Sequence, residues 1–183
     1  QIAYFRDRKV RLTGEPEESD TDNSSSLVAE AAAQLSQNLR TRAGIQWNPY
    51  ASGGKTEKGA ASIHYGDSEK RLVNFGYRYT RDLIEQTDVS FRWPITTRLH
   101  GVGRWNYSLK YDQTMATFAG FEYESCCWIT RLVAQQLRVS TNDNDESELQ
   151  NSVFLQLELK GLSSIGDKVD QYLERAIPGY QDE

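Results

Sequence analysis

Long apolar runs are missing from this sequence of 183 residues, and none approaches the roughly 20 residues that a membrane-spanning helix needs. The sequence therefore excludes a helical membrane protein.

Histidine is scarce, and His64 and His100 show no metal-ligand spacing with the two cysteines, so neither a metal site nor a cofactor is predicted. No constellation of acid, base and nucleophile is visible, which argues against an enzyme. A net charge of −5 disfavours nucleic acid as a partner, because phosphate-binding surfaces need clustered Lys and Arg.

An initial methionine and a signal peptide are also absent, and strand-like sequence begins almost at Gln1. We interpret the chain as a piece of a longer precursor, so that missing targeting signals say nothing about its location. The mean hydropathy of −0.69, taken alone, describes a soluble and mildly acidic domain. That average is a poor guide to a β-barrel, however, because only every second residue of a barrel strand touches lipid.

What the sequence has in abundance is alternation with a period of two residues. Val153, Leu155 and Leu157, for example, alternate with polar neighbours such as Gln156 and Glu158. Side chains alternate across a strand, so each such block is a ribbon with one apolar and one polar face. The blocks are Ile2–Val10, Leu27–Leu35, Arg40–Asn48, Gly59–Tyr65, Arg71–Thr80, Thr87–Trp93, Leu99–Tyr111, Thr114–Ser125, Trp128–Arg138 and Ser152–Lys160.

Two of these blocks are less clear than the others. Ile2–Val10 alternates poorly at its start. Leu27–Leu35 is rich in alanine and is compatible with a helix by propensity, although its neighbours favour a strand. Beyond Lys160 the pattern changes, with a turn predicted at Gly161–Ser164 and a short helical pattern over Asp167–Arg175.

A soluble sandwich or barrel also alternates, with its apolar face inward. Three features favour a membrane barrel instead. The blocks are long for strands of a soluble protein. Aromatic residues such as Tyr79, Trp93 and Tyr111 lie near block ends, as in the interfacial girdles of outer-membrane barrels. Short connections also tend to alternate with long polar ones, although the short link near Asp112 breaks the rule. Both interpretations remain open on the residues alone.

Cys126 and Cys127 are adjacent, and they are the only cysteines. Neighbouring cysteines rarely bond to each other, because the trans peptide directs their Cβ atoms apart. They are either small, half-buried apolar side chains or, in an oxidising periplasm, partners of cysteines outside this sequence.

Several ordered motifs resemble one family. The run Gly120–Trp128, which contains the cysteine pair, is similar to the Cys-Cys segment of the lipopolysaccharide-assembly LptD family (also called OstA or Imp). Arg92–Ile95 resembles its Trp-Pro turn, Leu157–Ser164 its last strand with the Gly-Leu-Ser-Ser that follows, and Gln1–Arg11 its Gln-x-x-Tyr-Phe-x-Asp-Arg segment. The matches keep their order over essentially the whole chain. The cysteine pair and the Leu-Lys-Gly-Leu-Ser-Ser segment are specific, whereas the alternation is generic.

This resemblance implies an all-β fold: the last ten antiparallel strands of a twenty-six-stranded transmembrane β-barrel, over residues 1–161, and a periplasmic C-terminal tail, over residues 162–183. It implies a Gram-negative outer-membrane location and insertion of lipopolysaccharide into the outer leaflet, through the lumen and a seam between the first and last strands. The implied partners are lipopolysaccharide, the lipoprotein LptE inside the barrel, the bridge protein LptA through the missing N-terminal domain, and outer-membrane lipids.

The resemblance also assigns roles to residues, none of them catalytic. Cys126 and Cys127 would form disulfides with two cysteines of the missing N-terminal part. Arg78, Arg92, Arg104 and Arg131 would face the lumen, where they could guide anionic sugars or meet LptE. The strand beside the seam would be formed by Ser152, Val153, Phe154, Leu155, Gln156, Leu157, Glu158, Leu159 and Lys160. Within that strand we expect Ser152, Gln156, Glu158 and Lys160 to face the lumen, and Val153, Leu155, Leu157 and Leu159 to face lipid.

Two rival functions remain. Another outer-membrane transporter or porin predicts a strand at the very end of the chain and no cysteine pair. A soluble all-β binding domain predicts that the aromatic face is a buried core and the polar face is outside.

Overall fold

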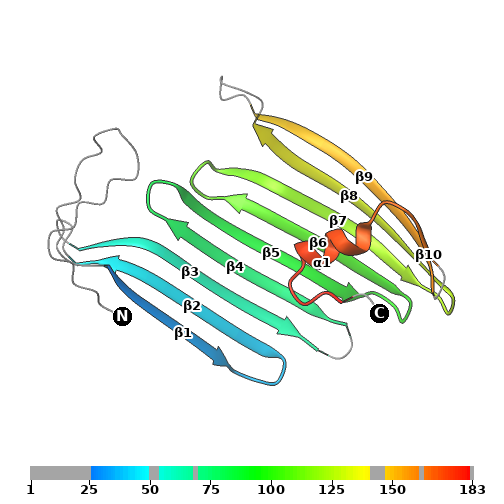
Figure 1. Cartoon of the computed structure of the whole chain (residues 1–183), viewed down its shortest axis with the longest axis horizontal. Coiled ribbons are helices and arrows are strands. Elements are labelled where there is room, and N and C mark those ends of the chain that lie inside the picture. The colour runs from blue at the N-terminus through cyan, green and yellow to red at the C-terminus, as the bar shows by residue number, and fades with distance from the viewer. Residues whose placement is uncertain (1–25, 50–53, 68–69, 141–146, 161–162, 182–183) are drawn as a thin grey trace.

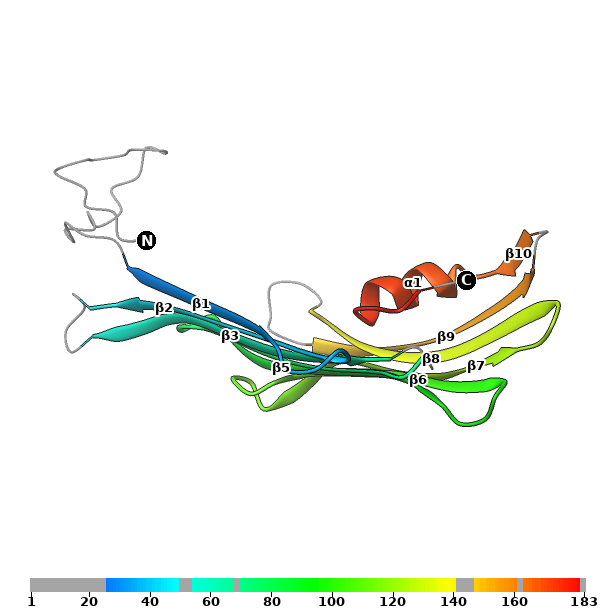
Figure 2. The same ribbon diagram turned by 90° about the horizontal axis from the view of Figure 1, so that it is seen from below.

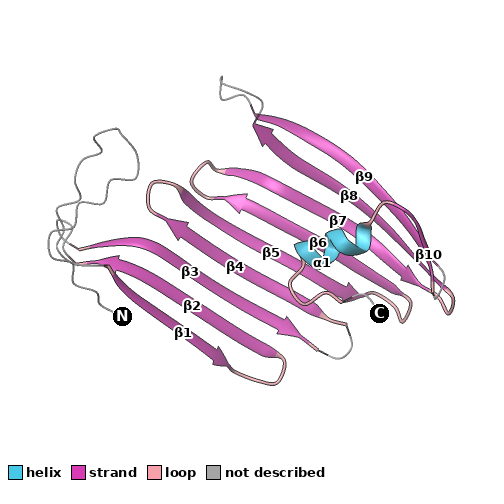
Figure 3. Cartoon of the chain, in the orientation of Figure 1, coloured by secondary structure: helices cyan, strands magenta, loops and turns pink. Residues whose placement is uncertain are grey.

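The computed structural model describes residues 26–49, 54–67, 70–140, 147–160 and 163–181. These residues form one antiparallel sheet and one short helix, α1 (Val169–Ala176) (Figures 1 and 3). The strands are β1 (Leu27–Gln34), β2 (Leu39–Asn48), β3 (Lys55–Gly66), β4 (Leu72–Thr80), β5 (Ile84–Pro94), β6 (Leu99–Ser108), β7 (Gln113–Glu124), β8 (Trp128–Ser140), β9 (Ser147–Leu159) and β10 (Ser163–Gly166).

Every strand pairs with its neighbours in sequence, so the sheet is an up-and-down meander from β1 to β10. Tight turns join strands at one end of the sheet: the Leu35 N–H donates to the Leu39 carbonyl oxygen at 2.9 Å, and the Ile95 N–H donates to Leu99 at 2.8 Å. At the opposite end the turn over residues 81–83 is also short, so the predicted alternation of short and long connections holds only in part. Such hairpin-linked strands need no crossover, and neighbouring strands can keep one register along their length.

The predicted strands correspond well to the observed ones from β1 onward. The alanine-rich block at Leu27–Leu35 is the strand β1, because its backbone pairs with β2 over its whole length. The block Ile2–Val10 lies outside the described residues. The observed β9 begins at Ser147, five residues before the predicted start at Ser152.

The turn predicted at Gly161–Ser164 is corrected by the structure. Ser163 and Ser164 belong to β10, which pairs in antiparallel register with the end of β9, from Ser163 opposite Leu159 to Gly166 opposite Gln156. The chain therefore adds a short tenth strand to the sheet before α1 begins.

The two faces of the sheet carry side chains of opposite character. One face carries exposed apolar side chains, including Phe75, Phe91 and Phe121, while the other carries buried polar ones, including Arg92 and Glu122. Phe121 is 55% exposed and its neighbour Glu122 only 2%. A buried polar group and a broad exposed apolar patch are both informative, because each is costly in water.

α1 covers part of the polar face, on the side toward which the sheet curves (Figure 2). Its buried residues Leu173 and Ile177, the latter just after the helix, pack with Val102, Phe118 and Val133 of the sheet in one apolar cluster. The Phe118 and Tyr172 rings meet edge to face, with 5.2 Å between their centroids. The helical pattern predicted at Asp167–Arg175 thus corresponds to α1, and its apolar stripe is what seats it on the sheet.

Among the described residues, no helix has the length and apolarity to cross a membrane.

Candidate functional site

The buried polar residues on the α1 side form a network centred on Glu122 of β7. Its carboxylate accepts hydrogen bonds from Arg92 of β5, from Arg131 Nε of β8 at 2.9 Å, and from the Tyr180 hydroxyl that follows α1. Arg131 also donates to Glu158 of β9 at 2.7 Å. One carboxylate thus joins three strands to the C-terminal segment.

Opposite charges balance inside this network. Isolated buried ions are strongly disfavoured, so the two guanidinium groups of Arg92 and Arg131 are tolerable only beside the carboxylates of Glu122 and Glu158. Arg92 also lies over the Tyr180 ring, 4.9 Å from its centroid. Two buried nitrogens, Arg92 Nε and His100 Nδ1, have no hydrogen-bond partner within the described ranges.

Tyr180 keeps its proton in this environment. Burial away from water, with the Glu122 carboxylate close by, raises the pKa of the Tyr180 phenol well above its ordinary value. The hydroxyl therefore remains a donor to Glu122 at any physiological pH.

Gln156 of β9 connects the same network to the start of α1. Its side-chain oxygen accepts the Asp170 backbone N–H at 2.9 Å, and its side-chain nitrogen donates to the Asp170 carboxylate at 2.9 Å. The first N–H groups of a helix lack partners within the helix. Lys168, which precedes α1, provides no side-chain cap. The strand therefore supplies the hydrogen bond that the helix start needs.

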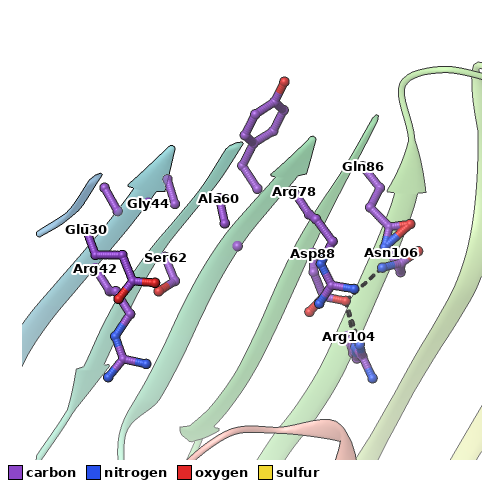
Figure 4. A pocket seen from close by; sticks show the side chains of 14 residues that line it. Glu30, Arg42, Gly44, Ala60, Ser62, Arg78, Gln86, Asp88, Arg104 and Asn106 are labelled. Atoms are coloured by element: carbon purple, nitrogen blue, oxygen red, sulfur yellow. Dashed lines mark hydrogen bonds and ion pairs between the residues drawn. The ribbon is translucent and has the colours of Figure 1, made fainter. Parts of the chain in front are cut away.

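Farther along the polar face, over β1 to β6, the surface is open and hollowed into a pocket of ≈ 430 Å³ (Figure 4). Arg42, Arg78 and Arg104 line it from β2, β4 and β6. Arg104 donates to Asp88 at 2.8 Å, and Asn106 donates to the same carboxylate oxygen at 3.0 Å (Figure 4). The polar face thus has two parts: one closed under α1, and one open and lined by both charges.

The four arginines predicted to share a lumen separate between these parts. Arg92 and Arg131 lie in the buried network, whereas Arg78 and Arg104 line the open pocket. Alternation placed all four on one face but could not show which would be covered. Sequence reasoning missed the hub, Glu122, and its partner Tyr180. Glu122 could have been found from its position on the polar face, but no sequence signal linked Tyr180 to it.

The residues of the predicted seam strand lie in β9, except Lys160, which follows it. Gln156 is buried, Glu158 bonds to Arg131, and Lys160 donates to Glu124 at 2.7 Å. The alternate residues Val153, Leu155 and Leu157 are exposed on the opposite face.

Cys126 and Cys127 lie in the tight turn between β7 and β8, where both are exposed and neither forms a disulfide within the described chain. A hydrogen bond between the two thiols lowers the pKa of Cys126 and raises that of Cys127. Cys126 is therefore the more readily ionised of the pair, and the thiolate that it forms is the reactive form of a cysteine. Within the described ranges, no three His, Cys, Asp or Glu side chains gather as metal ligands.

A long-stranded antiparallel meander with an apolar exposed face and a charged inner face defines a class: the wall of a transmembrane β-barrel. Comparison with known proteins gives the family. Residues 1–99 match the family described as "LPS transport system D", LptD. The chain belongs to the LptD family, whose members are outer-membrane β-barrel proteins of Gram-negative bacteria and not enzymes.

Relatives named LPS-assembly protein LptD match nearly the whole chain. The protein of Nitrosococcus oceani is 41% identical over 180 residues, that of Nitrosomonas eutropha is 39% identical over 180 residues, and that of Pseudomonas aeruginosa (strain LESB58) is 32% identical over 222 residues. These matches cover 98%, 98% and 99% of this chain, but only 23%, 23% and 24% of the relatives. The chain thus spans about a quarter of their length.

The Glu122 network predicts a large cost for removing one charge. Glu122→Gln leaves Arg92 and Arg131 buried without their shared carboxylate, which should lower the free energy of unfolding by about 3–5 kcal/mol. The measurement is equilibrium urea unfolding of the full-length protein in detergent, followed by tryptophan fluorescence. Glu148→Gln, at an exposed carboxylate of β9, is the matched control and should change little. Equal unfolding midpoints for the two variants would contradict the role of Glu122.

Proposed function

We propose that this chain forms part of the barrel wall of a lipopolysaccharide translocon, which inserts lipopolysaccharide into the outer leaflet of the outer membrane. The observation that carries the proposal is the pairing of an exposed apolar face with a charged inner face, in a chain of the LptD family. Residues 1–161 would form the wall and residues 162–183 the periplasmic tail, whose first element β10 extends the sheet.

The amphipathic substrate explains why such a wall needs both faces and a seam. A closed barrel spans lipid because every backbone group is paired. The acyl chains of lipopolysaccharide belong in lipid and its sugars in water, so the wall must open at a seam while the sugars cross the lumen. We place that seam at the outer edge of β9, which is the edge that faces away from β8. Gln156 and Glu158 would then point toward the lumen, and Leu155 and Leu157 toward lipid. The burial of Gln156 and the exposure of Leu155 support this orientation.

The open pocket is the part of the wall suited to an anionic substrate. Arg78 of β4 and Arg104 of β6 both line this pocket (Figure 4). We propose that they contact the phosphates and sugars of lipopolysaccharide or the lipoprotein LptE within the lumen. Arg104 is bonded to Asp88 but remains partly exposed to the pocket. Arg92 and Arg131 are buried as well as bonded to carboxylates, so their role is to hold the wall and the tail together. LptA would deliver lipopolysaccharide through the N-terminal domain that this sequence lacks.

Cys126 and Cys127 would form disulfides with the missing N-terminal part and keep it aligned with the seam. Their exposure at a strand end supports such linkages, since the turn leaves both thiols accessible. The role is mechanical rather than catalytic.

The proposed transport predicts substrate in the pocket. A photo-crosslinking residue that replaces Arg78 or Arg104 in living cells should capture lipopolysaccharide only while new lipopolysaccharide arrives. The same residue at Trp105, which is exposed on the apolar face and lies toward the end of β6 away from the cysteine turn, is the control: it should capture outer-leaflet lipopolysaccharide even after supply stops. Gel mobility shifts with lipopolysaccharide detection provide the readout. Absence of adducts at both arginine positions during active transport would refute the proposal.

The proposed disulfides predict a specific loss of assembly. Cys126→Ser combined with Cys127→Ser should reduce lipopolysaccharide delivery to the cell surface while the barrel still inserts. Ser125→Ala, in the same turn, should leave delivery unchanged. Non-reducing digestion and mass spectrometry of the unaltered full-length protein should link each cysteine to a distant N-terminal one. Two free thiols, or full transport by the double variant, would rule out this role.

A further inference from the structure

The outer edge of β9 is occupied along only part of its length. β10 pairs with β9 from Gln156 to Leu159. Asp167 extends this contact: its N–H donates to the Leu155 carbonyl oxygen at 3.1 Å, and its carboxylate accepts the Leu155 N–H at 3.3 Å. Within the described residues, the rest of this edge, from Ser147 to Phe154, has no neighbouring strand.

Alternation along the strand identifies the amides concerned. The Lys160 N–H donates to Cys127 at the β8 side, and the Leu155 N–H points to the opposite side, toward the tail. Successive N–H groups of a strand alternate in direction, so the N–H groups of Leu157 and Leu159 also point toward β10. Those of Asn151 and Val153 point to the unoccupied part of the same edge.

A glycine lets the tail leave this edge. Gly166 has a φ of +104°, and a Cβ at this position would lie 2.4 Å from the Leu155 carbonyl oxygen. Only a residue without a side chain fits both the conformation and the contact. The chain can therefore stay hydrogen-bonded to β9 through Asp167 and then cross directly over the polar face into α1.

A second anchor holds the tail beyond this crossing. Leu173 and Ile177 are fully buried against the sheet, Gln156 is bonded to Asp170, and Tyr180 is bonded to Glu122. The tail is thus fixed both to the edge of β9 and to the polar face of β7 to β9.

We propose that residues 163–181 act as a strap. They occupy the end of the β9 edge nearest the Cys126–Cys127 turn, and they leave only Ser147–Phe154 free to pair with another strand when the barrel closes. The partner of that free part is an antiparallel strand from the portion of the barrel that precedes this sequence. At the strapped end the seam cannot be closed by strand pairing, and it is bordered by the exposed apolar side chains of Leu157 and Ile165. An apolar, unzipped border suits acyl chains. This last consequence rests on the proposed function, whereas the occupancy of the edge does not.

Photo-crosslinking in the full-length protein in outer membranes tests the strap. A benzophenone residue that replaces Leu157 should form adducts with residues 163–167. The same residue at Val153, on the same face of the same strand, should form adducts with a barrel strand of the N-terminal portion. Mass spectrometry of the digested adducts identifies each partner. Adducts of the Leu157 position with the N-terminal strand would overturn the proposal, whether or not lipopolysaccharide is captured at Arg78.

Gly166→Ala gives an independent test. Because the added methyl group collides with the Leu155 carbonyl, the amides of Leu157 and Leu159 should exchange with deuterium roughly tenfold faster. Gly59→Ala in β3 is the control, since its Cβ would meet nothing closer than 3.8 Å, and it should leave the exchange of Leu157 and Leu159 unchanged. Unchanged exchange at Leu157 and Leu159 in Gly166→Ala would show that another strand protects this part of the edge.

Discussion

The buried carboxylate of Glu122 determines how this part of the chain is organised. It faces two guanidinium groups and one phenol that come from β5, β8 and the segment after α1. Each of these groups would be costly to bury without a partner, and Glu122 is the carboxylate that bonds to all three of them. The register of β5, β7 and β8 and the position of the C-terminal segment on the sheet therefore depend on each other. α1 adds an apolar cluster over the same strands, so the closed part of the polar face is held by charge and by packing together.

The second constraint is the environment of the opposite face. Phe75, Phe121 and Val153 are exposed there, whereas a soluble sheet would bury such residues in a core. A lipid environment removes this cost, and it also requires that backbone groups be paired. The tail meets that requirement along part of the β9 edge, where an unpaired strand would otherwise be open. The soluble all-β interpretation is therefore not supported, because the aromatic face is not a core.

The sequence predicted the strands well because alternation is a local property. Leu27–Leu35 is the informative case: alanine favours a helix, yet pairing with β2 makes it a strand. Local patterns could not predict β10, because Ser163–Gly166 is too short to show alternation and becomes a strand only through its contact with β9. Alternation along the strands was enough to place Arg78, Arg92, Arg104 and Arg131 on the polar face. Their division between an open pocket and a buried network did not, because it depends on where α1 lies. The link between Glu122 and Tyr180 joins residues 58 positions apart, and only the fold brings them together.

In this arrangement the apolar face of the sheet meets lipid and the polar face meets water. Nitroxide labels on the full-length protein in bilayers test it directly, at Phe75 and Phe121 on one face and at Ser62 and Arg78, which both line the open pocket, on the other. Relaxation at the first two sites should respond mainly to oxygen dissolved in lipid, and relaxation at the last two mainly to a water-soluble nickel chelate. Strong nickel accessibility at Phe75 and Phe121, with oxygen dominant at Ser62 and Arg78, would contradict this placement of the two faces.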